Sequence, residues 1–152
     1  MLSKKAKYGL HALGMLAQEY GNGPTLISDI AASEHIPHKF LELILLELKR
    51  KGILLSKKGK GGGYALSRPP SQITVGEVVR ALDGPIALLP CVSQTAYRRC
   101  DECVDELACG IRYVMKDVRE ATAAILDGTT LEDLVERGRK SRETSQVAMY
   151  HI

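Results

Sequence analysis

The sequence predicts a mainly α-helical fold with a small β wing, and three observations support this prediction. Apolar residues recur at intervals of three and four over several segments, which is the period of amphipathic helices. Two of these segments are separated by a tight turn, as in a helix-turn-helix. Two short β-prone runs then flank a stretch of lysines and glycines, as in a hairpin.

The first half of the chain contains three predicted helices. Residues 3–20 form the first. A short helix from about Leu26 to Glu34 follows, with Thr25 as its expected N-cap. A longer helix runs from Pro37 to about Lys51, because proline is well suited to a first helical position. Only His35-Ile36 separates the last two helices, which is the arrangement of a helix-turn-helix.

A hairpin directly follows these helices. The β-prone runs are Ile53–Ser56 and Tyr64–Ser67, and the segment between them consists of lysines and glycines. A hairpin after a helix-turn-helix is the wing of a winged-helix domain. Its tip can follow a phosphate backbone or enter a minor groove, because glycine allows close approach and lysine supplies charge. A nucleotide-phosphate loop is disfavoured, since a strand and not a helix follows the glycines.

The second half contains further predicted helices. Thr74-x-x-Glu77 is a capping box that opens a helix through Leu82. A strongly periodic helix covers residues 111–125, and Thr129-x-x-Glu132 opens a last short helix to about Arg137. We therefore divide the chain into a winged helix-turn-helix DNA-binding domain, a cysteine-rich loop, a dimerisation helix with the short helix, and a flexible tail: residues 1–84, 85–110, 111–137 and 138–152.

The long helix at residues 111–125 has two interpretations. Its apolar stripe either packs on its own domain or pairs with the same helix of a second copy. Ala121, Ala123 and Ala124 widen the small-residue face beyond what one core needs, which favours a homodimer. A two-fold dimer also matches the symmetry of palindromic DNA.

Charge is distributed unevenly along the chain. Residues 1–70 carry eleven Lys and Arg against five Asp and Glu, whereas residues 71–152 carry ten against thirteen. The first half therefore suits a polyanion such as nucleic acid. No apolar run approaches the length of a membrane span, and no Cys/His/Asp arrangement indicates a hydrolase. We expect a cytoplasmic protein that is not an enzyme and has no membrane partner.

All four cysteines lie in one segment with the spacing C-x8-C-x2-C-x5-C: Cys91, Cys100, Cys103 and Cys109. In a cytosolic chain, clustered thiols favour metal binding or redox sensing over structural disulfides. Structural zinc stays open, although zinc ribbons normally have two C-x-x-C pairs and this chain has one. A metal-free thiol–disulfide switch is a further alternative.

Several short motifs occur in the order that one known family has them: Lys7-Tyr8-Gly9-Leu10, Ile36-Pro37-x-Lys39-Phe40-Leu41-Glu42, Leu46-x-x-Lys49-x-x-Gly52, Gly59-x-Gly61-Gly62-Gly63-Tyr64-x-Leu66 and Val75-Gly76-Glu77-Val78. Over residues 1–135 the chain resembles the Rrf2 family of bacterial winged-helix transcription regulators. The resemblance implies a homodimer that binds palindromic double-stranded operator DNA. For members with three or more cysteines in this loop, it also implies an iron–sulfur cluster that sets DNA affinity, as in the iron–sulfur-biogenesis, nitric-oxide-sensing and redox-sensing branches.

The resemblance further implies three groups of DNA contacts. Near the N-terminus, the DNA backbone would be contacted by Lys4, Lys7 and Tyr8. The recognition helix would present to the major groove Pro37, His38, Lys39, Phe40 and Glu42. The wing would contribute Lys57, Lys58 and Lys60. Leu43 stands where relatives often have glutamine. Because leucine cannot hydrogen-bond a base edge, we expect an operator sequence that differs from the best-known one of the family.

The cluster ligands implied by the resemblance are Cys91, Cys100, Cys103 and Cys109, which suit either a [2Fe–2S] or a [4Fe–4S] cluster. Relatives commonly have three cysteines and sometimes a histidine three residues after the last, where this chain has Arg112. His11 occupies a position that supplies a ligand from the partner subunit in one redox-sensing branch. Four cysteines already suffice, so His11 is the less favoured ligand. The competing function is a cluster-free regulator, with zinc or free thiols, that a partner protein controls.

Overall fold

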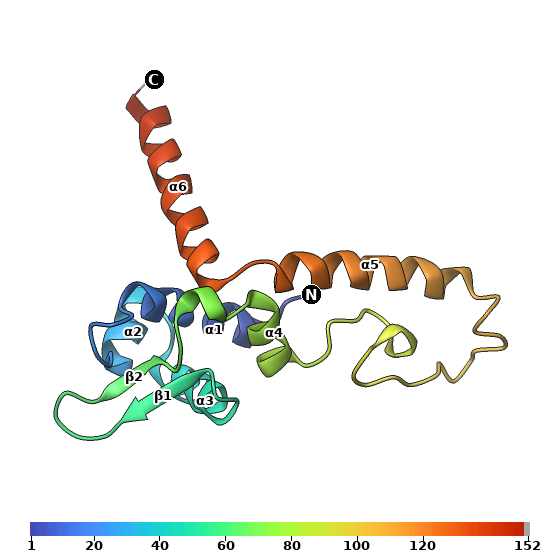
Figure 1. Ribbon diagram of the computed structural model, residues 1–152, viewed down its shortest axis with the longest axis horizontal. Helices are drawn as coiled ribbons and strands as arrows, with labels where there is room; N and C mark the ends of the chain where they lie inside the picture. Colours follow the sequence, from blue (N-terminus) through green and yellow to red (C-terminus); the bar gives the residue numbers. More distant parts are fainter. Residues whose placement is uncertain (151–152) are drawn as a thin grey trace.

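Four helices enclose an apolar core in the computed structural model, which describes residues 1–150 (Figure 1). Their bounds are α1 (Lys4–Gln18), α2 (Ile27–Glu34), α3 (His38–Arg50) and α4 (Val75–Asp83). Leu13, Ile30, Ile44 and Val78 are fully buried, one from each helix. Burial of such side chains is the main force that holds the four helices together.

The start of α1 is tied to the end of α4. The Ser3 hydroxyl accepts a hydrogen bond from the Ala6 backbone N–H at 3.0 Å, which is an N-cap. The Ser3 backbone N–H donates to the Asp83 carboxylate at 2.9 Å, and the Ser3 hydroxyl also bonds this carboxylate. The first and last helices of the core are therefore joined at their ends.

The wing consists of β1 (Leu54–Lys57) and β2 (Gly63–Leu66), which pair antiparallel with Leu54 opposite Leu66. The prediction that Thr25 caps α2 is wrong. Thr25 instead exchanges two backbone hydrogen bonds with Tyr64, both 2.8 Å long, and Leu26 precedes the helix without a side-chain cap. The backbone of Thr25 is thus used to fasten the base of the wing.

Much of the chain after α4 extends away from this core (Figure 1). A short turn of 3-10 helix, η1 (Pro70–Gln72), leads to α4, where the Thr74 hydroxyl accepts from the Glu77 N–H as the capping box predicts. The cysteine segment, with η2 (Pro90–Val92), then runs alongside α5 (Gly110–Asp127), and α6 (Leu131–Tyr150) follows.

The last helix begins and ends later than the sequence predicts. The Thr130 hydroxyl, not that of Thr129, accepts from the Asp133 N–H at 3.1 Å. The Thr129 hydroxyl donates to the Ile125 carbonyl at 2.8 Å and so belongs to the end of α5.

The prediction of a helix that ends near Arg137 is also wrong, because α6 continues to Tyr150. Side-chain pairs one turn apart support this extension. Arg139 binds Glu136 at 2.8 Å and also binds Glu143, and Lys140 lies 3.4 Å from Glu136. The predicted tail also includes residues 151–152, which lie outside the described residues.

The predicted fold class, mainly α with a small β wing, is confirmed. Over residues 1–150, each helix is too short or too polar to cross a bilayer.

Candidate nucleic-acid interface and cysteine segment

Helix α3 has one buried face and one exposed face. Leu41, Ile44, Leu45 and Leu48 are fully buried, since they recur at the helical period against α1, α2 and α4. The opposite face exposes three residues that we expected at the DNA: His38, Lys39 and Glu42. Leu43, at 65% exposure, belongs to the same face. The core therefore turns the expected reading residues outward.

Two other expected contact residues, Tyr8 and Phe40, pack on each other. Their rings meet edge to face, with centroids 5.7 Å apart and an interplanar angle of 75°. Both rings are partly buried against the core. Close by, Lys5 Nζ lies 3.1 Å from Glu47 Oε2. These contacts join α1 to α3.

The face of α3 carries one internal ion pair. His38 Nδ1 lies 3.4 Å from Glu42 Oε1, one helical turn away, and both side chains are about half exposed. Pro37, which we expected as the first helical residue, is the N-cap of α3. A base edge that binds Glu42 would therefore compete with His38 for the same carboxylate.

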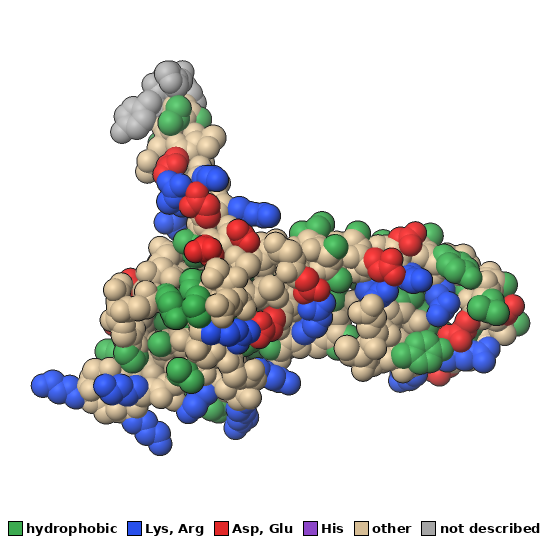
Figure 2. Space-filling model, in the orientation of Figure 1, with side chains coloured by type: hydrophobic (Ala, Val, Ile, Leu, Met, Phe, Trp, Pro, Cys, Tyr) green, Lys and Arg blue, Asp and Glu red, His purple; other side chains and the backbone are tan. Residues whose placement is uncertain are grey.

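Unpaired cations surround the wing and the ends of α1 and α3. Figure 2 shows Lys and Arg projecting from the wing and from the neighbouring surface, whereas acidic and basic side chains alternate over α5 and the cysteine segment. Among the side chains of residues 1–149, the following make no ion pair within 4.0 Å: Lys4, Lys7, Lys39, Lys49, Arg50, Lys51, Lys57, Lys58 and Lys60. Arg98, Arg99, Arg112, Arg137 and Arg142, in the second half, also make no ion pair within this range of residues. What distinguishes the surface around the wing is therefore the density of its lysines, which suits a polyanion.

The tip of the wing is built around its glycines. The Gly62 N–H donates to the Gly59 carbonyl at 3.0 Å, and Gly59 and Gly61 have positive φ angles. At the base, a Cβ on Gly63 would lie 2.2 Å from the Thr25 carbonyl oxygen. Lys57, at the end of β1, and Lys58 are thus held on a short, anchored hairpin.

Three cysteines of the segment, Cys91, Cys100 and Cys109, influence one another electrostatically. Cys91 is buried in η2, while Cys100, Cys103 and Cys109 are partly exposed. A hydrogen bond with the Cys91 thiol raises the pKa of Cys100, with desolvation and the charges of Cys91, Glu102 and Cys109 as further causes. The Cys103 N–H donates to the Cys100 carbonyl at 3.1 Å, so these two residues share a tight turn.

Hydrogen bonds from other side chains hold the segment in shape. Arg99 Nη2 donates to the carbonyls of Cys103 at 3.0 Å and Val104 at 3.2 Å. The Tyr113 hydroxyl donates to the Leu107 carbonyl at 3.0 Å, which fastens the segment to α5. A hydrogen bond to Glu106 raises the pKa of Tyr97 and links the two sides of the segment.

The donor set of this segment fits an iron–sulfur cluster in its chemistry. All four cysteines are free, and thiolates are the usual ligands of such clusters. Arg112, on the first turn of α5, has a buried Nε without a hydrogen-bond partner within residues 1–150, and a cation there suits a negatively charged group. In the described part of the chain, no group of three or more His, Cys, Asp or Glu side chains is already placed to hold a single metal ion.

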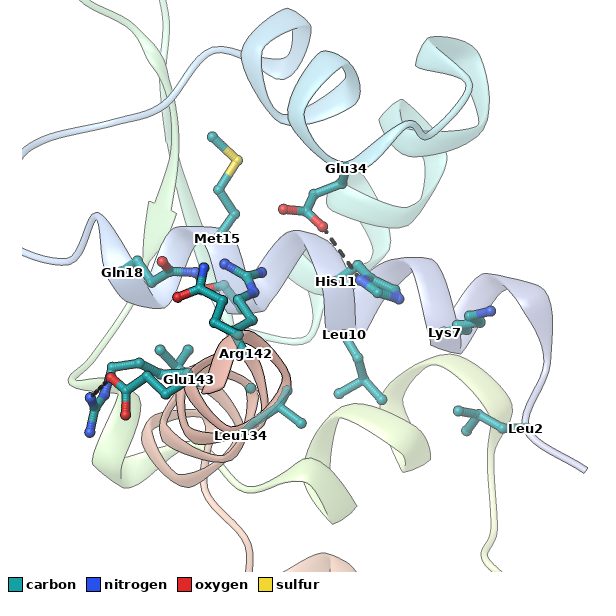
Figure 3. A pocket seen from close by; sticks show the side chains of 15 residues that line it. Leu2, Lys7, Leu10, His11, Met15, Gln18, Glu34, Leu134, Arg142 and Glu143 are labelled. Atoms are coloured by element: carbon teal, nitrogen blue, oxygen red, sulfur yellow. Dashed lines mark hydrogen bonds and ion pairs between the residues drawn. The ribbon is translucent and has the colours of Figure 1, made fainter. Parts of the chain in front are cut away.

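His11 lies apart from the cysteine segment of its own chain. It lines a groove of about 550 Å³ between α1 and α6, and its Nδ1 lies 3.4 Å from Glu34 Oε2 (Figure 3). Leu10 and Leu134 form apolar walls of the same groove. Within one protomer, His11 is therefore engaged by a carboxylate of α2 and not by the thiols.

One connection, between α4 and the helices that follow the cysteine segment, is absent from our sequence prediction. Arg80 on α4 and Asp127 at the end of α5 form an ion pair, and backbone hydrogen bonds join Val75 to Thr129 and Leu131 to Ile73. The paired side chains lie 47 positions apart, and no spacing rule links residues at that separation. The glycine of the Val75-Gly76-Glu77-Val78 motif could have indicated this contact, because Gly76 lies directly beneath the ion pair.

The Rrf2 family model, described as an iron-dependent transcriptional regulator, matches residues 2–137. The chain belongs to the Rrf2 family. An rrf2-like helix-turn-helix transcriptional regulator of Rhodobacter capsulatus is 43% identical over 141 residues, which cover 91% of this chain and 94% of the relative. The family resemblance seen in the sequence is therefore confirmed.

Solved Rrf2 structures share the fold. CymR, the global cysteine regulator of B. subtilis, matches with a TM-score of 0.75 and 33% identity, over 90% of this chain and 97% of CymR. IscR of T. potens matches with a TM-score of 0.74 and 27% identity, over 93% and 90%. As an Rrf2 protein, the chain is a DNA-binding transcription regulator.

Proposed function

We propose that this Rrf2 protein is a homodimeric regulator of palindromic operator DNA whose affinity for DNA is set by an iron–sulfur cluster on Cys91, Cys100, Cys103 and Cys109. The observation that carries the proposal is that all four cysteines are free and belong to one segment, which the Tyr113 hydroxyl fastens to α5. Helix α5 is in turn joined to the DNA-binding unit through Asp127 and Arg80. A change in the cysteine segment would therefore be transmitted through α5 to α4.

The DNA-binding part of the proposal rests on charge and exposure. His38, Lys39 and Glu42 would contact bases in the major groove, while Lys58 with its neighbours in the wing would neutralise phosphates. Tyr8 and Phe40 would act mainly by holding α1 against α3, because their rings are packed on each other.

The dimer rests on the outer face of α5. Ile111, Val114, Val118 and Ile125 are 65%, 57%, 38% and 65% exposed, and they follow the helical period along one stripe. Such a stripe on a projecting helix is the kind of surface that a second copy covers. We expect Val114→Glu to dissociate the dimer in analytical ultracentrifugation, while Val147→Glu, on the exposed end of α6, leaves it intact.

The cluster would supply a redox- and iron-sensitive group of negative charge. The chain's own residues would hold it through the four thiolates, and Arg112 would offer its unpartnered Nε to that charge. His11 stays the less favoured ligand, because Glu34 already engages it.

A second candidate function is favoured by one observation. Cys91 is the main cause of the raised pKa of Cys100, and both thiols are free, so a suitable two-electron oxidant could join them in a disulfide without a metal. In this alternative the protein is a cluster-free regulator, with zinc or free thiols, that answers to thiol oxidation or to a partner protein.

Anaerobic purification separates the two candidates. The cluster proposal predicts a coloured protein whose visible absorption, iron and sulfide match one [2Fe–2S] or [4Fe–4S] cluster per chain. Each Cys→Ser variant should lose iron, whereas Thr95→Ser, in the same segment, should retain it. A colourless protein without iron, with zinc or with four titratable thiols, would refute the cluster and favour the second candidate.

A further inference from the structure

Arg119 is the only buried charged residue among the described side chains, with 7% of its surface exposed. Its Nη2 donates to Glu120 Oε1 at 3.0 Å, and Glu120 is itself 54% exposed. Its Nε is buried and has no hydrogen-bond partner within residues 1–150. A guanidinium withdrawn from water is stable only when its charge and N–H groups are matched. One half-exposed carboxylate leaves this cation incompletely matched.

Arg119 lies at the boundary of two hollows. The smaller, of about 20 Å³, is bounded by Arg80, Ser93 and Thr95 among others. The larger is a groove of about 490 Å³ between α1, α4, residues 85–88 and α5. A volume of this size is typical of sites for small molecules.

The walls of the larger groove are mainly apolar, with Leu10, Val79, Leu88 and Leu126 among them. Asp83 and the α-amino group of Met1 are the other charged groups of residues that line it, and Ser3 already binds the Asp83 carboxylate twice. The groove therefore combines an apolar surface with the buried, incompletely paired guanidinium of Arg119. Its one carboxylate, that of Asp83, is already hydrogen-bonded to Ser3.

We propose that this groove binds a small amphipathic carboxylate. The carboxylate would pair with the guanidinium of Arg119, which is suited to two-point binding of such groups, and an aliphatic tail would lie along the apolar walls. Because α4 and α5 form opposite sides of the groove, an occupant sets their separation. The site is a second input to the regulator that uses none of the four thiols.

The test uses the full-length chain, reduced and free of metal, without DNA. Octanoate, octylammonium and acetate are titrated by calorimetry and followed by NMR shifts of Val79 and Leu126. We expect saturable binding of octanoate, and binding of the other two that is weaker by about tenfold or more. Arg119→Gln should weaken octanoate binding by a similar factor, Arg119→Lys should keep part of it, and Lys116→Gln, on the exposed side of α5, should leave it unchanged.

Three results overturn the proposal. Equal binding of octanoate and octylammonium would mean that the charge of Arg119 plays no part. An unchanged octanoate affinity in Arg119→Gln would mean the same. No saturable binding of octanoate to the wild-type protein would mean that the groove is not a site for a carboxylate. If Arg119→Gln fails to fold, the comparison of head groups on the wild-type protein still decides. Because neither iron nor DNA is present, failure here leaves the cluster proposal untouched.

Discussion

The guanidinium of Arg80 and the carboxylate of Asp127 face each other at two points, with Nη1–Oδ1 and Nη2–Oδ2 distances of 2.6 and 2.8 Å. The hydrogen bond from Arg80 is the main reason that the pKa of Asp127 lies below its usual value. Both side chains are more than one third exposed, so the pair itself stabilises the fold by less than about 1 kcal/mol. Its importance is geometric, because it fixes the end of α5 on α4.

Gly76 leaves room for this pair, since a Cβ there would lie 2.0 Å from Asp127 Oδ1. We expect Gly76→Ala to destabilise the wild-type protein by up to about 1 kcal/mol. In an Asp127→Ala background the same substitution should stabilise it by up to about 1 kcal/mol, because alanine is the better helix former and the clash is gone. Urea unfolding at one protein concentration measures both effects. Equal effects in the two backgrounds would contradict the steric account.

Gly63 and Gly61 provide a matched test of the base of the wing. Both have positive φ angles, of 135° and 73°, but only Gly63 has a neighbouring backbone where a Cβ would lie. We expect Gly61→Ala to cost about 1 kcal/mol through backbone strain alone, and Gly63→Ala to cost at least about 2 kcal/mol more. Thermal or urea unfolding reports both losses. Similar losses in the two variants would mean that the contact with Thr25 is unimportant.

His35 is the only residue other than glycine with a positive φ angle, 55°, in the part of the chain that the structure describes. It ends α2 in the left-handed conformation, which glycine adopts without strain. We expect His35→Gly to stabilise the protein by about 0.5–1 kcal/mol. His35→Ala is the control, since it removes the same side chain but keeps the strain. A gain of equal size in the alanine variant would assign the effect to the imidazole instead.

Lys58 projects from the tip of the wing without an ion-pair partner among the described side chains. If it neutralises a phosphate, Lys58→Ala should lower the slope of log affinity against log salt by about 1 for each wing that binds. Fluorescence anisotropy on operator DNA over a range of salt measures the slope. Lys140→Ala removes the same charge from α6 and should leave the slope unchanged. An unaltered slope in Lys58→Ala would refute the assignment of the wing.

The extended part of α6 should depend on pH through Glu136. The hydrogen bond from Arg139 lowers the pKa of Glu136 from 4.5 to about 2. Because this folded-state pKa is depressed, the contribution to helix stability is complete above about pH 4.5 and is lost as the pH falls toward 2. Carbon chemical shifts of residues 136–143 should report a loss of helix in that window. Glu136→Gln should show a smaller change there, and identical profiles would exclude this ion pair as the cause.

Much of the DNA-binding unit was predictable because its determinants are local. The apolar period of α3, Pro37 at its start and the glycines of the wing act within a few residues of one another. The predicted N-cap at Thr74 was confirmed for the same reason, whereas the Glu77 carboxylate binds Arg68 instead of closing the capping box. The N-cap of α6 was assigned wrongly because the neighbouring Thr129 and Thr130 have the same hydroxyl group. The N-cap of α2 was assigned wrongly because the backbone of Thr25 is hydrogen-bonded to Tyr64 in β2.

The winged-helix architecture, the run of lysines around the wing and the presence of four thiols in one segment follow from the sequence alone. Which distant groups meet depends on the tertiary structure, which brings Thr25 to Tyr64 and Arg80 to Asp127. It also decided that Arg119, one of several cations on α5, is buried beside an apolar groove. The reason is physical. Helical period and capping depend on neighbours in the chain, whereas burial and ion pairing depend on which surfaces the folded helices bring into contact.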